Sequence, residues 1–299
     1  MEHLHVVITL FNLKFYDRDK RNTAVGTPLW LKKRLALFDK YCFPSVVAQS
    51  CKDFVWLVLL DAGTDTETRA LMADYAARCP NMRLHYLTAA EALAYTKTDT
   101  PTGRSLLHDI IAGMATGGER LIATSNLDND DALHRDYASR VAAFLRSRHA
   151  RTGNDAPQAE LLSFPYGYQY FPGKEILLRM RYPHNHFLTL VERADSNYLG
   201  IVSYPHTRAR KQLPNTDVCC EPLWMEVVHD SNVNNDLRIT SRIAYAPRLR
   251  SFSFKGFGRD ASVPAWRNVL NLFGPIPLLL LRTAISRLRK KLWKQREQA

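Results

Sequence analysis

Apolar residues along the first half of the chain change repeatedly between short runs and helical spacing. The runs that we interpret as strands are residues 5–11, 54–60, 82–87 and 120–127. The segments between them that carry apolar residues at helical intervals are 29–41, 66–79, 103–114 and 132–149. Strands that alternate with helices at this spacing predict an α/β fold with a mostly parallel, doubly wound sheet flanked by helices.

The pattern changes after residue 150. The loop 151–157 ends the alternation, and the runs 161–170 and 175–182 then flank the turn sequence Phe171-Pro172-Gly173-Lys174, which predicts a β-hairpin. A further strand is expected at 186–192. We therefore divide the chain into an α/β part at 1–150, a smaller β-rich part of the same domain at 151–258, and a tail at 259–299.

Three carboxylates follow the apolar run 120–127 directly: Asp128, Asp130 and Asp131. Open α/β sheets bind ligands at the carboxyl ends of their strands. Carboxylate oxygens suit Mg²⁺ or Mn²⁺, which can bridge to a nucleotide diphosphate. Asp128 and Asp130 are two residues apart and are expected to point the same way, whereas Asp131 is expected to cap a helix beginning near Ala132. The alternative is that all three only cap that helix or solvate a turn.

Composition excludes several classes of protein. The chain is 46% hydrophobic and 23% charged, as in ordinary globular proteins. Residues 238–299 hold 14 Lys or Arg against 2 Asp or Glu, which equals the whole net charge of +12. A neutral body argues against nucleic-acid binding. Five cysteines without a CxxC pair fit neither a zinc cluster nor a disulfide scaffold, so reduced cytosolic thiols are expected. We see no signal peptide and no apolar run of about 20 residues that could span a bilayer.

Three spaced motifs resemble those of GT-A glycosyltransferases of the family-2-like kind. Asp61 ends the second strand in Leu-Leu-Asp-Ala-Gly-Thr-Asp, which is similar to the nucleotide-contacting segment of such enzymes. Leu127-Asp128-Asn129-Asp130-Asp131 is similar to their DxD motif, and Trp224-Met225-Glu226-Val227-Val228-His229 follows about a hundred residues later. More narrowly, residues 5–258 resemble a bacterial rhamnosyltransferase family, through phrases such as Ile8-Thr9-Leu10-Phe11-Asn12 and Phe54-Val55-Trp56-Leu57.

The resemblance implies transfer of a sugar, rhamnose being one candidate, from a nucleotide-diphosphate donor with Mn²⁺ or Mg²⁺. The metal ligands that it implies are Asp128, Asp130 and His229. The donor-binding residues that we expect are Thr9, Phe11, Asn12, Asp61, Arg104 and Asp128. For His229 the alternative is a packed or solvated histidine with no ligand.

An inverting transfer also needs a general base that accepts the proton of the acceptor hydroxyl. We expect Glu221, before Pro222, to be this base. Its rivals are Asp217 and Glu226, and we expect Glu226 to be a solvent-facing helix residue. Aromatic residues at 164–171 can stack a sugar ring, although alternating aromatics on a strand more often pack a core. Arg208, Arg210 and Lys211 can contact a phosphate, with a solvated basic loop as the alternative.

The tail combines an apolar helical face with basic residues. Between Leu278 and Lys294, apolar residues recur at helical spacing, and residues 278–299 carry 7 basic residues and 1 acidic residue. This composition is typical of a helix that lies on anionic lipid. It predicts a cytoplasmic enzyme peripheral to the inner face of the bacterial cell membrane, with a glycan or lipid-linked acceptor. The alternative is a helix docked on its own domain or on a partner.

Two other classes of protein compete with a glycosyltransferase. One is a non-catalytic protein that binds nucleotide sugars or carbohydrates. The other is a metal-dependent sugar phosphotransferase, which would release nucleoside monophosphate instead of diphosphate.

Overall fold

A computed structural model describes residues 3–13, 24–96, 101–152, 157–195, 198–218, 220–229 and 252–264, with the isolated positions 266, 281 and 285. Most of the basic tail, and with it the predicted lipid-binding helix, lies outside these residues. Within the described ranges, no helix has both the length and the apolar character that a bilayer span requires.

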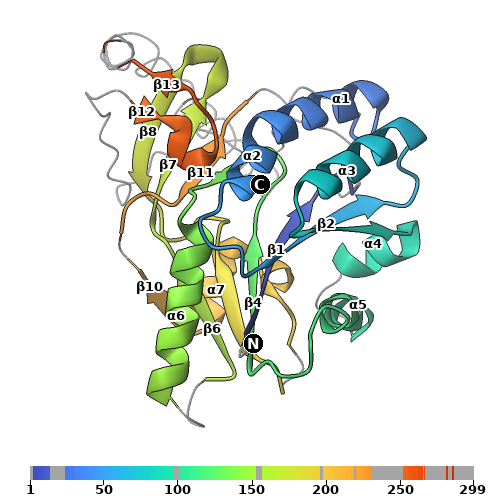
Figure 1. Cartoon of the computed structure of the whole chain (residues 1–299), viewed down its shortest axis with the longest axis vertical. Helices are drawn as coiled ribbons and strands as arrows, with labels where there is room; N and C mark the ends of the chain where they lie inside the picture. The colour runs from blue at the N-terminus through green and yellow to red at the C-terminus, as the bar shows by residue number, and fades with distance from the viewer. Residues whose placement is uncertain are drawn as a thin grey trace, which may run out of the picture.

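A seven-stranded sheet forms the centre of the molecule (Figure 1), in the order β10-β6-β9-β4-β1-β2-β3. Its parallel part consists of β1 (His3–Leu10), β2 (Val55–Asp61), β3 (Met82–Leu87) and β4 (Leu121–Asn126). These strands confirm the predicted doubly wound arrangement. The sheet continues through β9 (Thr189–Arg193), antiparallel to β4, then β6 (Ala159–Ser163) and β10 (Asn215–Asp217). Strands from the β-rich part therefore extend the same sheet.

Helices cover both faces of this sheet. The helical segments are α1 (Pro28–Leu37), η1 (Phe38–Cys42, a π-helix), α2 (Phe43–Val47), α3 (Thr66–Arg78), α4 (Ala89–Thr96), α5 (Pro101–Ala112), α6 (Tyr137–Thr152) and α7 (His206–Gln212), with short 3-10 turns at Pro172–Lys174, Ile201–Ser203 and Phe254–Phe257. The Thr27 hydroxyl accepts a hydrogen bond from Trp30 N at 3.3 Å, and Pro28 follows as the first helical residue. Proline is favoured at this position because the first N–H groups of a helix have no partner within it.

Alternate residues of the parallel strands pack into two separate cores. Val7 and Val58 face one core, together with η1, α3 and α6. Ile8 and Leu57 face the other, together with Leu107 of α5. A parallel sheet buried on both faces in this way has near-continuous apolar strands, which explains the runs in the sequence.

A second, four-stranded sheet stands on the side of the molecule away from β3 and α4 (Figure 1). Its order is β5 (Ala132–Leu133), β11 (Trp224–Val227), β7 (Tyr166–Phe171) and β8 (Ile176–Arg181). The antiparallel pair β7–β8 confirms the predicted hairpin. The short strands β12 (Phe252–Ser253) and β13 (Ser262–Val263) lie on either side of the 3-10 turn Phe254–Phe257. The turn adds Phe254 and Phe257 to the core of this sheet, and β13 adds Val263.

Two expected elements were wrong. Residues 161–170 are not one strand but β6 and β7, which belong to different sheets and meet at Phe164-Pro165. Proline has no N–H for a strand ladder, and the Phe164 carbonyl instead accepts the Trp224 indole at 2.7 Å. The helix expected from Ala132 begins at Tyr137, because Ala132 and Leu133 pair with Met225 and Trp224 as β5.

A chain of buried polar groups crosses the central sheet. His5 Nε2 lies 2.8 Å from Ser125 Oγ, which lies 2.6 Å from Thr189 Oγ1. Tyr137 Oη continues the chain at 3.0 Å from Thr189 Oγ1 and donates to the Phe187 carbonyl at 2.8 Å. Burial lowers the pKa of His5 to about 3, with the neighbouring His3 acting in the same direction, so His5 is neutral. This series of hydrogen-bonded side chains links β1, β4 and β9.

Candidate active site at the carboxyl edge of the sheet

Polar residues from three parallel strands meet at one edge of the sheet. Asn12 follows β1, Asp61 ends β2, and Asp128 follows β4 by two residues. Because β2, β1 and β4 are adjacent and parallel, their carboxyl ends lie side by side. This is the edge at which open α/β sheets bind ligands.

The loop after β2 fixes the carboxylate of Asp61. Asp61 Oδ1 accepts the Gly63 N–H at 2.6 Å, and the Asp61 carbonyl accepts the Thr64 hydroxyl at 2.5 Å. Asn12 joins the loop to β1, since its Oδ1 accepts the Asp61 N–H at 3.0 Å and its Nδ2 donates to Thr64 Oγ1 at 2.9 Å. The side chain of Asn12 is thus used to hold the loop.

The segment after β4 is tied to β1 through Asn129. Its Nδ2 donates to the Leu10 carbonyl at 3.1 Å and to the Phe11 carbonyl. Asn129 Oδ1 accepts a hydrogen bond from Arg34 of α1 at 3.0 Å. This residue therefore sets the position of the aspartates on either side of it.

Asp130 is buried in an ion-paired group. Its Oδ2 lies 2.6 Å from Arg34 Nη1 and 2.8 Å from His229 Nε2. Burial opposes charge on this carboxyl, but the Arg34 guanidinium and the His229 hydrogen bond outweigh burial and hold the pKa of Asp130 well below its usual range. The structure thus brings together Asp130 and His229, two of the three predicted metal ligands.

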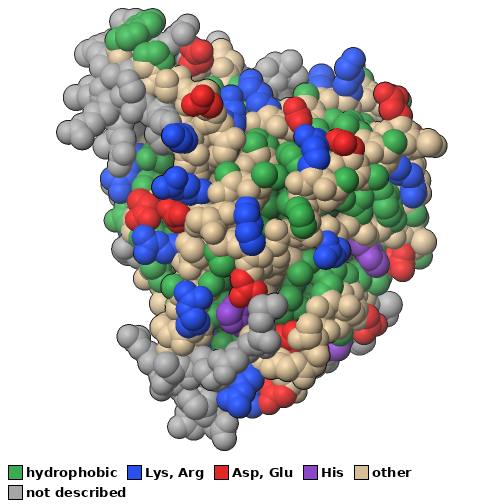
Figure 2. Space-filling model, in the orientation of Figure 1, with side chains coloured by type: hydrophobic (Ala, Val, Ile, Leu, Met, Phe, Trp, Pro, Cys, Tyr) green, Lys and Arg blue, Asp and Glu red, His purple; other side chains and the backbone are tan. Residues whose placement is uncertain are grey.

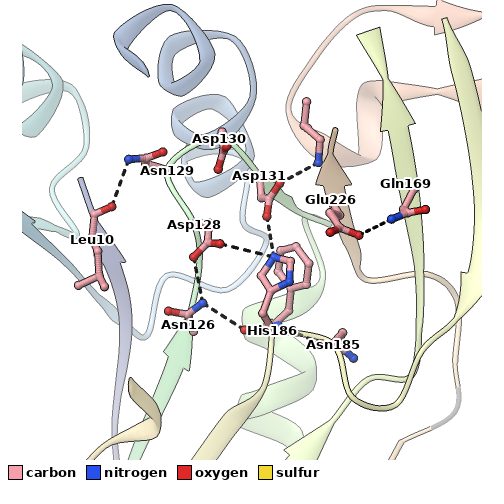
Figure 3. A network of polar contacts seen from close by, with 12 residues as sticks. Leu10, Asn126, Asp128, Asn129, Asp130, Asp131, Gln169, Asn185, His186 and Glu226 are labelled. Carbon is pink, nitrogen blue, oxygen red and sulfur yellow. Dashed lines mark hydrogen bonds and ion pairs between the residues drawn. The ribbon is translucent and has the colours of Figure 1, made fainter. Parts of the chain in front are cut away.

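Asp128 and Asp131 form a second group with His186, which precedes β9 (Figure 3). His186 Nε2 lies 2.7 Å from Asp131 Oδ2 and 3.8 Å from Asp128 Oδ2. Asp131 Oδ1 accepts the Val227 N–H at 2.7 Å. The ligand atoms of the three residues lie within 4.8 Å of one another, so they can hold a metal ion. Asp131 therefore does not cap a helix, and this expectation was wrong because no helix begins at Ala132.

Exposure and charge differ within this second group. The Asp128 side chain is 47% exposed, whereas that of Asp131 is fully buried. Burial opposes charge on His186, but its hydrogen bond to Asp131 and the negative charges of Asp128 and Asp131 outweigh burial and raise the pKa of His186 to about 9. At neutral pH the imidazolium of His186 thus neutralises part of the acidic group.

Glu226 is a buried strand residue, which corrects the expected solvent-facing helix position. It lies in β11, is 1% exposed, and accepts a hydrogen bond from Gln169 Nε2 of β7 at 2.7 Å. Glu226 and Gln169 lie directly opposite each other on the paired strands β11 and β7. In Figure 3 the pair stands beside Asp131 and His186, so Glu226 borders the acidic group.

The other predicted base candidates are held by arginines. Glu221 lies in the loop before β11, where its Oε1 pairs with Arg140 of α6 at 2.8 Å, and both side chains are exposed. The hydrogen bond from Arg140 lowers the pKa of Glu221. Asp217 pairs with Arg210 of α7 at 2.6 Å. Glu221 is thus held at the surface, whereas Asp217 is half-buried.

Several residues that were predicted to bind the nucleotide-sugar donor pack or form hydrogen bonds within the fold. The Thr9 hydroxyl accepts the Trp56 indole at 2.9 Å, and the Phe11 ring packs on Phe38 at 5.2 Å between ring centroids. Both side chains are buried. Arg104 lies in α5, and its side chain falls outside the described residues.

The aromatic run in 164–171 serves mainly as core. The buried members are Phe164, Tyr168, Tyr170 and Phe171. Tyr166 is half-buried, with the Arg179 guanidinium 5.2 Å from its ring centroid. Arg34 and His186 were not among the residues predicted from the sequence. Of these, His186 could have been found only by knowing that β9 runs antiparallel to β4, which brings the start of β9 beside the end of β4.

Comparison with known protein families matches residues 8–241 to a family described as "Putative rhamnosyl transferase". The chain belongs to this family. The match includes the end of β1, the Asp61 loop, Asp128–Asp131, His186, Glu226 and His229, so all the groups of the candidate site lie inside the shared region. It confirms the resemblance that the sequence motifs indicated.

The comparison with curated proteins gave no match. Among solved structures, the chain is similar to S. aureus TarS 1–349, with 11% identity, a TM-score of 0.38, and coverage of 75% of this chain and 60% of that chain. It is also similar to S. aureus TarS 1–349 in complex with UDP, with 17% identity, a TM-score of 0.29, and coverage of 55% and 36%. The chain thus spans 60% and 36% of the lengths of these two solved structures.

Proposed function

We propose that this member of the family is a glycosyltransferase that moves a sugar, with rhamnose as the first candidate, from a nucleotide-diphosphate donor to a glycan or lipid-linked acceptor. The observation that carries the proposal is the meeting of Asp61 and the Asp128–Asp131 group at one carboxyl edge of a parallel sheet, in a chain of a transferase family. Asp61 suits the nucleoside of the donor, which offers hydroxyl and base donors. The Asp128–Asp131 group suits the diphosphate with its metal.

The carboxylate oxygens at this edge fit a hard divalent cation such as Mn²⁺ or Mg²⁺. Such an ion would neutralise the charge that develops on the leaving nucleoside diphosphate. Asp128 is the exposed carboxylate and the ligand common to both candidate sets. Asp130 with His229 completes the set implied by the motifs, and Asp131 with His186 completes the set that lies within 4.8 Å.

Paired variants decide between the two sets. Asp130→Asn with His229→Gln removes one pair of donors, and Asp131→Asn with His186→Gln removes the other. Mn²⁺ binding to the folded chain, measured by electron paramagnetic resonance, should be lost in one double variant and retained in the other. Retention in both, and in Asp128→Asn, would exclude a metal site at this edge.

We propose an inverting transfer in which a carboxylate takes the proton of the acceptor hydroxyl. Glu221 is the base expected from its position in the sequence, and Glu226 competes with it because it borders the acidic group (Figure 3). Glu226→Gln keeps the shape and the acceptor oxygen for Gln169, and Glu221→Gln is its matched control. The variant that lowers kcat by roughly a hundredfold or more, with the donor KM unchanged, identifies the base.

The charge of the body agrees with a small anionic donor better than with nucleic acid. Figure 2 shows basic side chains interspersed with acidic ones over the visible face rather than gathered into one stripe. A nucleic-acid groove would instead concentrate Lys and Arg along a single surface.

The experiment that tests the function incubates the purified chain with Mn²⁺, a panel of nucleotide sugars and a lipid-linked acceptor extract. Release of nucleoside diphosphate together with a new glycoside supports a glycosyltransferase. Release of nucleoside monophosphate would identify a phosphotransferase, and nucleotide-sugar binding without any turnover would identify a binding protein. The anomeric configuration of the product, read by NMR, tests inversion.

We further propose that the basic tail brings the enzyme to the inner face of the bacterial membrane. Each basic residue near an anionic surface contributes about 1 kcal/mol, and salt weakens this attraction. Removal of residues 278–299, which carry 7 basic residues and 1 acidic residue, should abolish sedimentation with phosphatidylglycerol vesicles and leave donor binding intact. Aggregation or unfolding of the shortened chain would instead show that the tail is part of the core.

A further inference from the structure

The loop that presents Asp61 is held by a cation from the following helix. Arg69 in α3 donates from Nε to the Thr64 carbonyl at 2.8 Å and from Nη2 to the Ala62 carbonyl. One guanidinium thus joins two carbonyls on either side of Gly63. Because the guanidinium is planar with a fixed fork of donors, it sets the distance and angle between those carbonyls.

Arg69 is itself oriented by β3. Its guanidinium stacks on the Tyr86 ring with Cζ 4.2 Å from the ring centroid. A flat cation stacked on a ring loses fewer conformations than a free one when it binds, so the stacking prepares Arg69 for the loop. The Ala62 N–H also donates to the Leu87 carbonyl at 2.7 Å, so β3 holds the same loop through the main chain.

The other side of the loop is fixed by β1. Asn12 accepts the Asp61 N–H and donates to the Thr64 hydroxyl, as described above. Gly63 lies between these supports, and a Cβ at Gly63 would come within 2.8 Å of Asp61 Oδ1. The carboxylate of Asp61 is therefore aimed by contacts from β1, β3 and α3, with no side-chain cation bound to the carboxylate itself among the contacts of the described residues.

We propose that Arg69 is a positioning residue for the donor nucleotide. It does not contact the nucleotide but keeps the loop 61–65 in the shape that presents Asp61. The inference rests on the proposed function, because it assigns the Asp61 loop to the nucleoside end of the donor. Arg69 thus contributes to the affinity for the donor although it does not contact the donor.

The sequence offers a matched control at the opposite end of β3. Arg83 also caps two main-chain carbonyls, those of Pro80 at 2.7 Å and Met82 at 2.9 Å, but these lie where β3 begins. Arg69→Ala and Arg83→Ala therefore remove the same chemistry at opposite edges of the sheet. Only the first should change nucleotide binding.

The experiment measures the Kd of UDP, GDP and dTDP by calorimetry with Mn²⁺ for the full chain and its variants. We expect Arg69→Ala to weaken the best nucleoside diphosphate about tenfold, Arg69→Lys to recover part of this loss, and Arg83→Ala to have no effect. The double variant Asp61→Ala, Arg69→Ala should bind the nucleoside diphosphate only slightly more weakly than Asp61→Ala alone, because both changes act on one contact.

Three outcomes overturn the proposal in distinguishable ways. Unchanged affinity in Arg69→Ala, with weakened affinity in Asp61→Ala, leaves the nucleotide site in place and removes the role of Arg69. Fully additive losses show that Arg69 acts independently of Asp61. No nucleoside diphosphate binding to the unaltered chain overturns the proposed function and the role of Arg69 together. Circular dichroism melting curves establish that each variant is folded when its Kd is measured.

Discussion

The carboxylates after β2 and after β4 are held in opposite ways. Asp61 is partly exposed, and its loop is fixed by main-chain groups, Asn12 and Arg69. Asp130 and Asp131 are buried, and each is paired directly with a cationic or protonated side chain. Exposed carboxylates can be removed with little effect on folding, whereas a buried charge that loses its partner is costly. The comparison therefore predicts which aspartates serve stability as well as function.

Asp131→Ala should give the largest loss of stability. It leaves the protonated His186 and the Val227 N–H without their buried acceptor, and breaking a buried pair in this way costs about 3–5 kcal/mol. Urea unfolding followed by tryptophan fluorescence measures the change. A loss of stability below about 1 kcal/mol would show that Asp131 and His186 do not form a charged pair.

Asp130→Asn should cost less, about 2 kcal/mol, because asparagine keeps an acceptor for Arg34 but removes the charge. The loss should depend on pH. The pKa of Asp130 is lowered in the folded chain, so its contribution is present above the unfolded-state value, about 3.9, and is lost as pH falls through the folded-state value.

The difference in unfolding free energy between the unaltered chain and Asp130→Asn should therefore be full at pH 6 and shrink below about pH 4. Urea titrations at pH 6, 4 and 3 test this dependence. A difference that grows toward low pH would contradict the ion pair.

Asp128→Asn should change stability by about 0.5 kcal/mol or less, since the side chain is about half exposed. The same change should weaken Mn²⁺ binding and lower kcat/KM by roughly a hundredfold or more, because a divalent ion loses a charged ligand. The matched comparison is Asp136→Asn, at another carboxylate near the surface that is paired with its neighbours. Normal transfer in Asp128→Asn would remove it from the site.

Asp61→Ala should have the smallest effect on folding and a selective effect on donor binding. The nucleoside contact does not change in the transition state, so KM for the donor should rise about tenfold with kcat nearly constant. Initial rates at varied donor concentration separate the two constants. A normal KM with a collapsed kcat would place Asp61 at the reacting bond instead.

The first half of the fold could be predicted because its signals are local. Apolar runs of β1, β2, β3 and β4 are followed by helical spacings, and the carboxylates stand directly after the strands. The parallel order then brings Asp61 and Asp128 to one edge without further information.

The second half could not be predicted in the same way because its pairings join distant residues. Glu226 is buried only because β11 lies between β5 and β7, and the sequence between Ala132 and Trp224 does not reveal this. Arg34 reaches Asp130 from α1 across 96 positions, so a local pattern classes it as a surface helix residue. The partners of a charge decide its role, and they come from the tertiary fold.

The polar chain through His5, Ser125, Thr189 and Tyr137 has a consequence for how the chain folds. A slip of β4 by one residue would turn buried side chains to the wrong face, but a slip by two would keep every face and satisfy the apolar pattern. Only the correct alignment places the Ser125 hydroxyl between His5 and Thr189. These polar groups therefore favour the correct alignment of β4, and this alignment places Asp128 two residues beyond the end of the strand.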